Sequence, residues 1–179
     1  DFTIEFWMKT ATISNGAALI SKRGSCGNEI FYEVRMLADG RLYFELNGDP
    51  FPLTTTSSVT NNLWHHVAIT SELGLNKIYV DGLVEDSLTT FLTSFANNKN
   101  LKLGQGPCGA YAGQLEEIRF WDVARTPAEI LAAKNTSVPS NSSNLQAYFK
   151  LDEGTGTTLF NAVNNNASGT LLNGPQWIT

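Results

Sequence analysis

Residues 2–10 read Phe-Thr-Ile-Glu-Phe-Trp-Met-Lys-Thr and contain the clearest strand signal of the chain. From Thr3 to Thr10 the pattern alternates, with Ile4, Phe6 and Met8 on one side and polar residues or Trp on the other. An alternation with a period of two is typical of a β-strand that buries one face. The sequence therefore predicts a strand at 3–10 whose Ile4, Phe6 and Met8 side chains lie in a core.

Comparable segments follow at short spacing. Residues 30–37 alternate, and residues 41–46 alternate again after Asp39-Gly40, a dipeptide that strongly favours a hairpin turn. A second turn of this kind, Asp81-Gly82, lies between 77–80 and 83–84. Many short strands joined by Gly and Asn turns predict an all-β sandwich. Further strands are expected at 64–70, 101–103, 114–121 and 146–151.

One short helix interrupts the strand pattern. In Thr126-Pro127-Ala128-Glu129, the Thr is an N-cap, the Pro suits the first helical position, and the Glu three residues after the Thr completes a capping box. We expect this helix at 127–134, followed by a polar loop rich in Ser and Asn.

Length and composition fit one globular domain over residues 1–179. Apolar residues make up 42% and charged residues 16% of the chain, and its net charge is -5. Because no Lys/Arg cluster occurs and no apolar run is long enough to span a bilayer, we expect neither nucleic-acid binding nor membrane insertion. The polar residues are mostly Asn, Thr, Ser and Gly, as in many secreted β-proteins. The chain begins inside a strand pattern, so we expect a fragment of a larger secreted protein.

The two cysteines, Cys26 and Cys108, lie in similar loops of small residues. This match predicts a disulfide and therefore an oxidising compartment, here the outside of the cell. Closing a loop of about 80 residues would stabilise the fold by ~4 kcal/mol in the chain-entropy model. The alternative is a pair of free thiols in a cytosolic protein.

Five segments, taken together, point to a known family. They are 2–10, Trp64-His65-His66-Val67-Ala68, Tyr79-Val80-Asp81-Gly82, Leu103-Gly104-Gln105 and 113–125. In this order they resemble the concanavalin A-like superfamily, in particular its laminin-G-like and pentraxin jelly rolls. The resemblance implies a two-sheet antiparallel jelly-roll sandwich with one short helix, and it extends from residue 2 to about 134. The fold hosts lectins, adhesion modules, spacers and glycosidases, so it leaves the function open.

Calcium chemistry departs from the pentraxin pattern. Pentraxins bind paired calcium ions through acidic residues on two loops, which here read Gly27-Asn28-Glu29 and Gln105-Gly106-Pro107-Cys108. Calcium prefers six to eight oxygen ligands, and the second loop has no carboxylate. The resemblance therefore implies that this paired site is largely lost. We expect a disulfide to join the two loops that calcium joins in pentraxins, and we expect neither pentamers nor phosphocholine binding.

A single structural calcium ion is a separate hypothesis. Asn47 and Asp49 resemble the rim position at which laminin-G domains place a calcium-binding Asp, and the alternative is an ordinary turn. Residues 152–156 with Asn161 form another oxygen-rich segment, for which a plain loop is the alternative.

Ligand contacts are expected on loops beside the predicted disulfide, from Arg23, Asn28, Gln105 and Tyr111. Aromatic rings stack on pyranose rings, while Asn, Gln and Arg side chains bind sugar hydroxyls. The alternative for each aromatic residue is packing in the core. Other aromatic residues near the candidate loops are Tyr32, Tyr43 and Trp64.

Catalysis is not expected. Retaining glycosidases of this fold carry Glu-x-Asp-x-x-Glu, which places two carboxylates on one face, whereas Glu116 and Glu117 point to opposite faces. His65 and His66 are also adjacent on a strand and cannot share one metal ion. Glu33 and Glu45 are the other strand carboxylates, and nothing pairs them convincingly as catalytic groups.

These observations predict a non-catalytic extracellular module that recognises a glycan or a cell-surface or matrix protein through rim loops. The alternative is a structural or adhesive domain that contacts neighbouring copies of itself. Three Asn-x-Ser/Thr sequons, at Asn135, Asn141 and Asn166, are candidate glycosylation sites.

Overall fold

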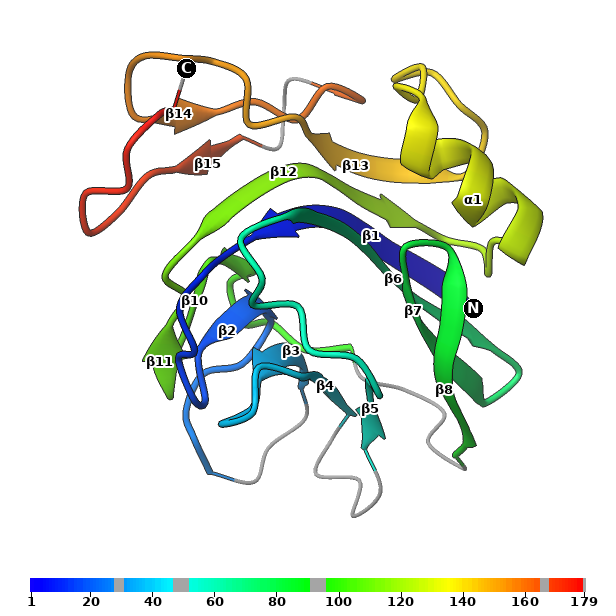
Figure 1. Ribbon diagram of the computed structural model, residues 1–179. Helices are drawn as coiled ribbons and strands as arrows, with labels where there is room; N and C mark the ends of the chain where they lie inside the picture. The colour runs from blue at the N-terminus through cyan, green and yellow to red at the C-terminus, as the bar shows by residue number, and fades with distance from the viewer. Residues whose placement is uncertain (28–30, 47–51, 91–95, 165–167, 179) are drawn as a thin grey trace.

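A computed structural model describes residues 1–27, 31–46, 52–90, 96–164 and 168–178. Two β-sheets pack face to face, and the larger sheet arches over the smaller one (Figure 1). The short helix α1 lies on the outer side of the larger sheet, and a small two-stranded sheet lies beside its β13 edge (Figure 1). The predicted all-β jelly-roll sandwich with one short helix is therefore confirmed.

The larger sheet, called sheet A, has the strand order β13-β12-β1-β6-β7-β8 and is antiparallel throughout. Its central strand β1 places Ile4, Phe6 and Met8 in the core, as the alternation predicts. The strands are β1 (Phe2–Lys9), β6 (Trp64–Glu72), β7 (Leu75–Val80), β8 (Leu83–Thr89), β12 (Gln114–Trp121) and β13 (Leu145–Phe149).

The other sheet, called sheet B, is smaller because its seven strands are short. Its order is β10-β11-β2-β3-β4-β5, and β9 also pairs with β2. The contact of β11 with β2 is parallel at Ala110 and Ala18, a local departure from the antiparallel prediction. Gly109 permits this approach, since a Cβ there would lie 3.1 Å from the Gly16 carbonyl oxygen. The strands are β2 (Ala18–Ser21), β3 (Tyr32–Met36), β4 (Leu42–Leu46), β5 (Leu53–Thr54), β9 (Lys102–Leu103), β10 (Gln105–Gly106) and β11 (Gly109–Ala110).

Both predicted hairpin turns are confirmed. Asp39-Gly40 joins β3 to β4, and Asp81-Gly82 joins β7 to β8. Gly40 and Gly82 have φ angles of 80° and 85°, which glycine adopts without a steric cost. The turns fix the strand registers and so decide which side chains face each other across each hairpin.

The main core is filled by inward residues of both sheets. The C-terminal part of the chain contributes to the same core, because Leu159 is buried in it and Trp177 packs against it. Leu159 belongs to β14 (Thr158–Leu159), which pairs with β15 (Gly169–Thr170).

Helix α1 (Pro127–Asn135) covers part of the outer face of sheet A. The Thr126 side chain accepts a hydrogen bond from the backbone N–H of Glu129, and the Glu129 carboxylate accepts one from the backbone N–H of Thr126, so the predicted capping box is present. Ile130 is buried against Ala68 and Tyr79, which attaches the helix to the sheet.

A cluster of charged side chains is buried on the outer face of sheet A. Glu5 is fully buried and accepts hydrogen bonds from the Trp121 indole at 2.8 Å and from Arg125 at 2.7 Å. Arg119 and His66 lie 3.8 and 3.3 Å from its carboxylate. Burial alone would raise the pKa of Glu5, but the nearby His66 ring and the positive charges of Arg125 and Arg119 outweigh it and lower the pKa.

Candidate functional site

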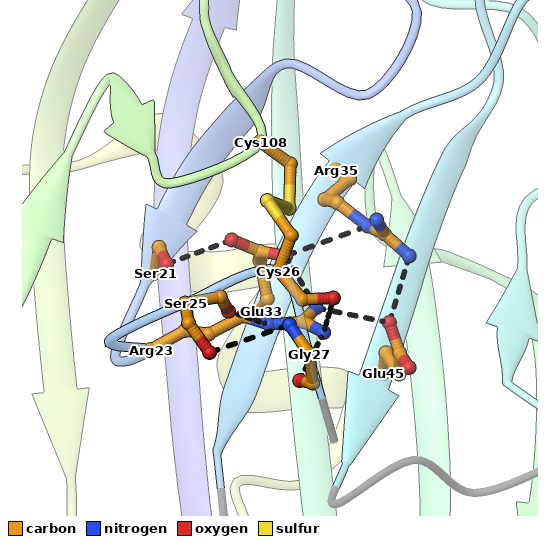
Figure 2. Close-up of a disulfide and its surroundings, with 9 residues drawn as sticks. All are labelled: Ser21, Arg23, Ser25, Cys26, Gly27, Glu33, Arg35, Glu45 and Cys108. Carbon is orange, nitrogen blue, oxygen red and sulfur yellow. Dashed lines mark hydrogen bonds and ion pairs between the residues drawn. A yellow bond between two sulfur atoms is a disulfide. The ribbon is translucent and has the colours of Figure 1, made fainter. Parts of the chain in front are cut away.

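The predicted disulfide between Cys26 and Cys108 is present, with the two Cα atoms 5.6 Å apart. It joins the loop after β2 to the turn between β10 and β11, and it lies in front of the outer face of sheet B (Figure 2). Both loops are thereby held over strands β2, β3 and β4, so the disulfide defines one side of a candidate binding face.

Polar side chains form rows on the face beneath the disulfide. Glu33 pairs with Ser21 on one side and with Glu45 on the other, and Arg35 pairs with Tyr43 in the adjacent row. Residues two apart on a strand point to the same face, so all five share the outer side of sheet B. With Arg23, these residues are named the disulfide face.

The charges of the disulfide face balance. Glu33 and Glu45 lie directly opposite each other, an arrangement that is unfavourable for two like charges. Arg23 Nη1 lies 3.2 Å from Glu33 and 3.6 Å from Glu45, while Arg35 lies 3.4 Å from Glu33 and 2.7 Å from Glu45. Each guanidinium therefore bridges both carboxylates, as the dashed lines in Figure 2 indicate.

Arg23 holds the cysteine loop in place. Its side chain donates hydrogen bonds to the carbonyl oxygens of Ser25, Cys26 and Gly27 at 2.6, 3.1 and 2.9 Å. The guanidinium also lies 3.8 Å from the centre of the buried Phe31 ring. Because these bonds satisfy three consecutive carbonyls of an irregular loop, they fix the loop over Glu33.

The accessible part of the disulfide face consists of Arg35, Tyr43 and Glu45. The Arg35 side chain is 23% exposed and that of Glu45 is 12% exposed, whereas Glu33 is fully buried. The Arg35 guanidinium lies 4.9 Å from the centre of the Tyr43 ring. Partial burial raises the pKa of Tyr43, and the neighbouring Glu45 charge adds to this shift, so the phenol stays neutral.

The structure places the four candidate ligand residues in different environments. Arg23 is 4% exposed, and its guanidinium donates hydrogen bonds to the cysteine loop. Tyr111 points inward, and its hydroxyl donates a hydrogen bond to the Lys9 carbonyl at 3.0 Å. Gln105 is exposed and accepts a hydrogen bond from Asn173 at 2.7 Å. Asn28 lies outside the described residues. Ligand contact by each of them stays a prediction.

The metal hypothesis also stays a prediction, because Asn47 and Asp49 lie outside the described residues. In the second oxygen-rich segment, Asn161 is buried, and its side-chain oxygen accepts hydrogen bonds from the backbone N–H groups of Tyr148 and Val163. Within the described ranges, no group of three or more His, Cys, Asp or Glu side chains is placed to hold a metal ion.

The two histidines lie on opposite faces of β6, as predicted, but both are engaged. His66 is fully buried next to Glu5, and His65 contacts Asp81 at 2.8 Å. Of the sequons, Asn141 lies exposed in the loop after α1. The Asn135 side chain and Asn166 are outside the described part of the chain, and glycosylation of all three stays a prediction.

Sequence reasoning missed the association of Glu33, Glu45 and Arg35, although a signal for it exists. The turn at Asp39-Gly40 fixes the β3–β4 register, so residues whose numbers add to 78 face each other. This relation places Glu33 opposite Glu45 and Arg35 opposite Tyr43.

Comparison with known proteins identifies the family. A model of the concanavalin A-like lectin/glucanases superfamily, of the laminin-G type, matches residues 1–131. The chain therefore belongs to this superfamily.

Similar proteins include multidomain chains and carbohydrate-binding domains. The rat sushi, von Willebrand factor type A, EGF and pentraxin domain-containing protein 1 is 27% identical over 141 residues, which cover 72% of this chain and 4% of that protein. A Bacteroides ovatus protein assigned to carbohydrate binding matches 98% of this chain and 54% of its own, with 22% identity and a TM-score of 0.75. The carbohydrate-binding domain (CBM40) of a Ruminococcus gnavus sialidase was solved with α2,3-sialyllactose bound. The match covers 74% of this chain and 81% of that domain's chain, with 19% identity and a TM-score of 0.62. These structural matches share the fold with this chain.

No helix in the described ranges is long and apolar enough to cross a membrane.

Proposed function

We propose that this chain is a non-catalytic glycan-binding module of an extracellular protein and that the disulfide face is its binding site. One observation carries the proposal: Arg35, Tyr43 and Glu45 are presented together on paired strands, and a covalently closed loop borders them. The disulfide and the likeness to a multidomain protein with sushi, EGF and pentraxin domains support the extracellular location.

The chemistry of these three side chains suits a sugar. The Tyr43 ring offers an apolar surface to the C–H groups of a pyranose, while Arg35 donates and Glu45 accepts hydrogen bonds with neighbouring hydroxyls. The ion pair between Arg35 and Glu45 orients both groups before a ligand arrives. Such preorganisation reduces the entropy lost on binding.

The same geometry argues against hydrolysis. Glycosidases need two carboxylates that reach the glycosidic bond from a cleft. Here Glu33 is fully buried, accepts a hydrogen bond from Ser21 at 2.7 Å and is paired with both arginines. Structural neighbours that bind carbohydrate, among them the sialidase domain, support a binding role for this fold.

A glycan array, probed with calcium and with EDTA, is the first test. The best glycan is then titrated by calorimetry against three variants. Tyr43→Ala should weaken binding about tenfold, the loss that ~1.4 kcal/mol produces, and Tyr43→Phe should keep most of the affinity because it keeps the ring. Arg41→Ala is the matched control, since Arg41 lies just before β4 and pairs with Asp39 outside the disulfide face. Equal affinities for Tyr43→Ala and Arg41→Ala would exclude this face as the site.

An adhesive role is the second candidate, because apolar side chains are exposed along one edge of sheet A. Leu83 and Val84, at the start of the edge strand β8, are 71% and 51% exposed. Contact between copies through this edge predicts concentration-dependent dimers in sedimentation experiments that Leu83→Lys abolishes. A monomer at all concentrations would contradict self-association.

A further inference from the structure

A pocket of about 340 Å³ lies on the opposite side of the sandwich from the disulfide face. It is a depression open to solvent, and it is lined by helix α1, the segment that follows β12 and the loop at 136–144. Ligand pockets for small molecules begin at about 300 Å³, so the space accommodates one ligand of monosaccharide size.

Arg125 forms a fixed polar wall of this pocket. Its Nη1 donates to Glu5 at 2.7 Å, its guanidinium lies 4.2 Å from the centre of the Trp121 ring, and its backbone N–H donates to Thr3 at 2.8 Å. The side chain is 12% exposed, and its other N–H groups have no acceptor among the described residues. Arg125 therefore presents oriented, unused donors to the pocket.

The facing wall is a loop with a defined conformation. The backbone N–H and the hydroxyl of Ser142 both donate to the Pro139 carbonyl, and the Asn144 carbonyl accepts from the Asp122 N–H at 3.0 Å. This loop and its flanks place the Asn144 amide, the Ser137 and Ser143 hydroxyls and the apolar Val138 around the pocket. Residues with hydroxyl, amide and small apolar side chains therefore make up this wall.

The charges around the pocket select the class of ligand. Arg125 is offset by Glu129, which also lines the pocket, so the lining is close to neutral. Glu129 is held by the capping box and cannot turn away without breaking it. A neutral ligand with several hydroxyls satisfies both the arginine donors and the carboxylate acceptors. An anion would be repelled by Glu129, and a cation would be repelled by Arg125.

We infer that this pocket, named the helix pocket, is a second saccharide site that takes one neutral hexose unit. The ligand class rests on the proposed glycan-binding function, while the location rests on the pocket geometry alone. Because the helix pocket and the disulfide face lie on opposite outer sides of the sandwich, two sites there bind two separate glycan chains. Such a module crosslinks two glycan chains; it does not bind one chain at two places.

Two substitutions of the same kind test the inference. Ala132 and Ala128 are both exposed on helix α1, but only Ala132 lines the pocket. Ala132→Trp fills the helix pocket, and Ala128→Trp serves as the matched control. Both variants and the wild type are titrated with neutral hexoses in the millimolar range while backbone amide signals are followed by NMR.

We expect saturable shifts at Val138 and Ser143 in the wild type and in Ala128→Trp, and their loss in Ala132→Trp. Shifts at Arg35 and Tyr43 report the disulfide face separately. Shifts only at the disulfide face would overturn the helix pocket and leave the proposed function intact. Shifts only at the helix pocket would support the inference, and the glycan array would then decide on the disulfide face. The absence of shifts at both places would overturn the helix pocket and leave the disulfide face to the glycan array.

Discussion

Removal of the disulfide gives the sharpest test of the fold energetics. The sequence separation of Cys26 and Cys108 is 82 residues. In the chain-entropy model a loop of this length is worth about 4.5 kcal/mol at 25 °C. For a chain of this size, 1 kcal/mol changes Tm by about 2–4 °C, so the double variant Cys26→Ala/Cys108→Ala should melt about 9–18 °C lower.

The native structure explains why this loss should arise mainly in the unfolded state. Without the disulfide, Arg23 still donates to three carbonyls of the cysteine loop, and Glu33 still holds Arg23. We therefore expect the folded variant to keep its sheet structure, while its unfolded chain is less restricted. A less restricted unfolded chain exposes more surface, so the urea m-value should rise.

Thermal and urea unfolding, followed by circular dichroism, measure both quantities. Wild-type protein with a reducing agent is the control, and it should behave like the double variant. Thiol titration of the folded wild type should find no reactive cysteine. Two titratable thiols in the folded wild type, or a variant with the wild-type Tm and m-value, would refute the reasoning.

Three further predictions concern other parts of the molecule. Glu5→Gln should destabilise the fold by ~3–5 kcal/mol in urea unfolding, because it leaves Arg125 buried without its countercharge and leaves Glu117 as the carboxylate partner of Arg119. Since folding lowers the pKa of Glu5 from 4.5, the stabilisation by its carboxylate is complete above pH 4.5 and is lost as the pH falls further. The Tm of the wild type should therefore drop below pH 4.5, and the Tm of Glu5→Gln should drop less. Thr126→Ala should cost about 1 kcal/mol by removing the capping box of α1, whereas Thr136→Ala should cost less. If Asn47 and Asp49 hold calcium, calcium should raise the Tm of the wild type but not of Asp49→Asn, and equal Tm values with calcium and EDTA would reject that site.

The sandwich was predictable because its strands bury one regular face. Ile4, Phe6 and Met8 reach the core as alternation requires, and the turn at Asp39-Gly40 forms where two local signals agree. Alternation, turn residues and capping boxes are local properties of the chain, so one sequence is sufficient to find them.

The buried outer faces were not predictable from the same patterns. Thr3 and Glu5 lie on the side of β1 opposite the core, yet both are fully buried because α1 and its flanking segments cover that side. Tyr111 likewise turns inward because the Lys9 carbonyl is available to its hydroxyl. These outcomes depend on partners more than 100 residues away, and no local pattern specifies them.

Both candidate sites use the same device, a buried glutamate that fixes a partly exposed arginine. Glu33 and Glu5 are fully buried, and they hold Arg35 at 3.4 Å and Arg125 at 2.7 Å. A buried ion pair is seldom more stabilising than apolar packing, so specificity is the stronger reason to keep one at each site. It follows that Glu33→Gln should weaken glycan binding at the disulfide face although Glu33 touches no ligand, because Arg35 loses one of its two anchors. Calorimetry on folded Glu33→Gln measures this loss, and an unchanged affinity would show that Glu45 alone orients Arg35.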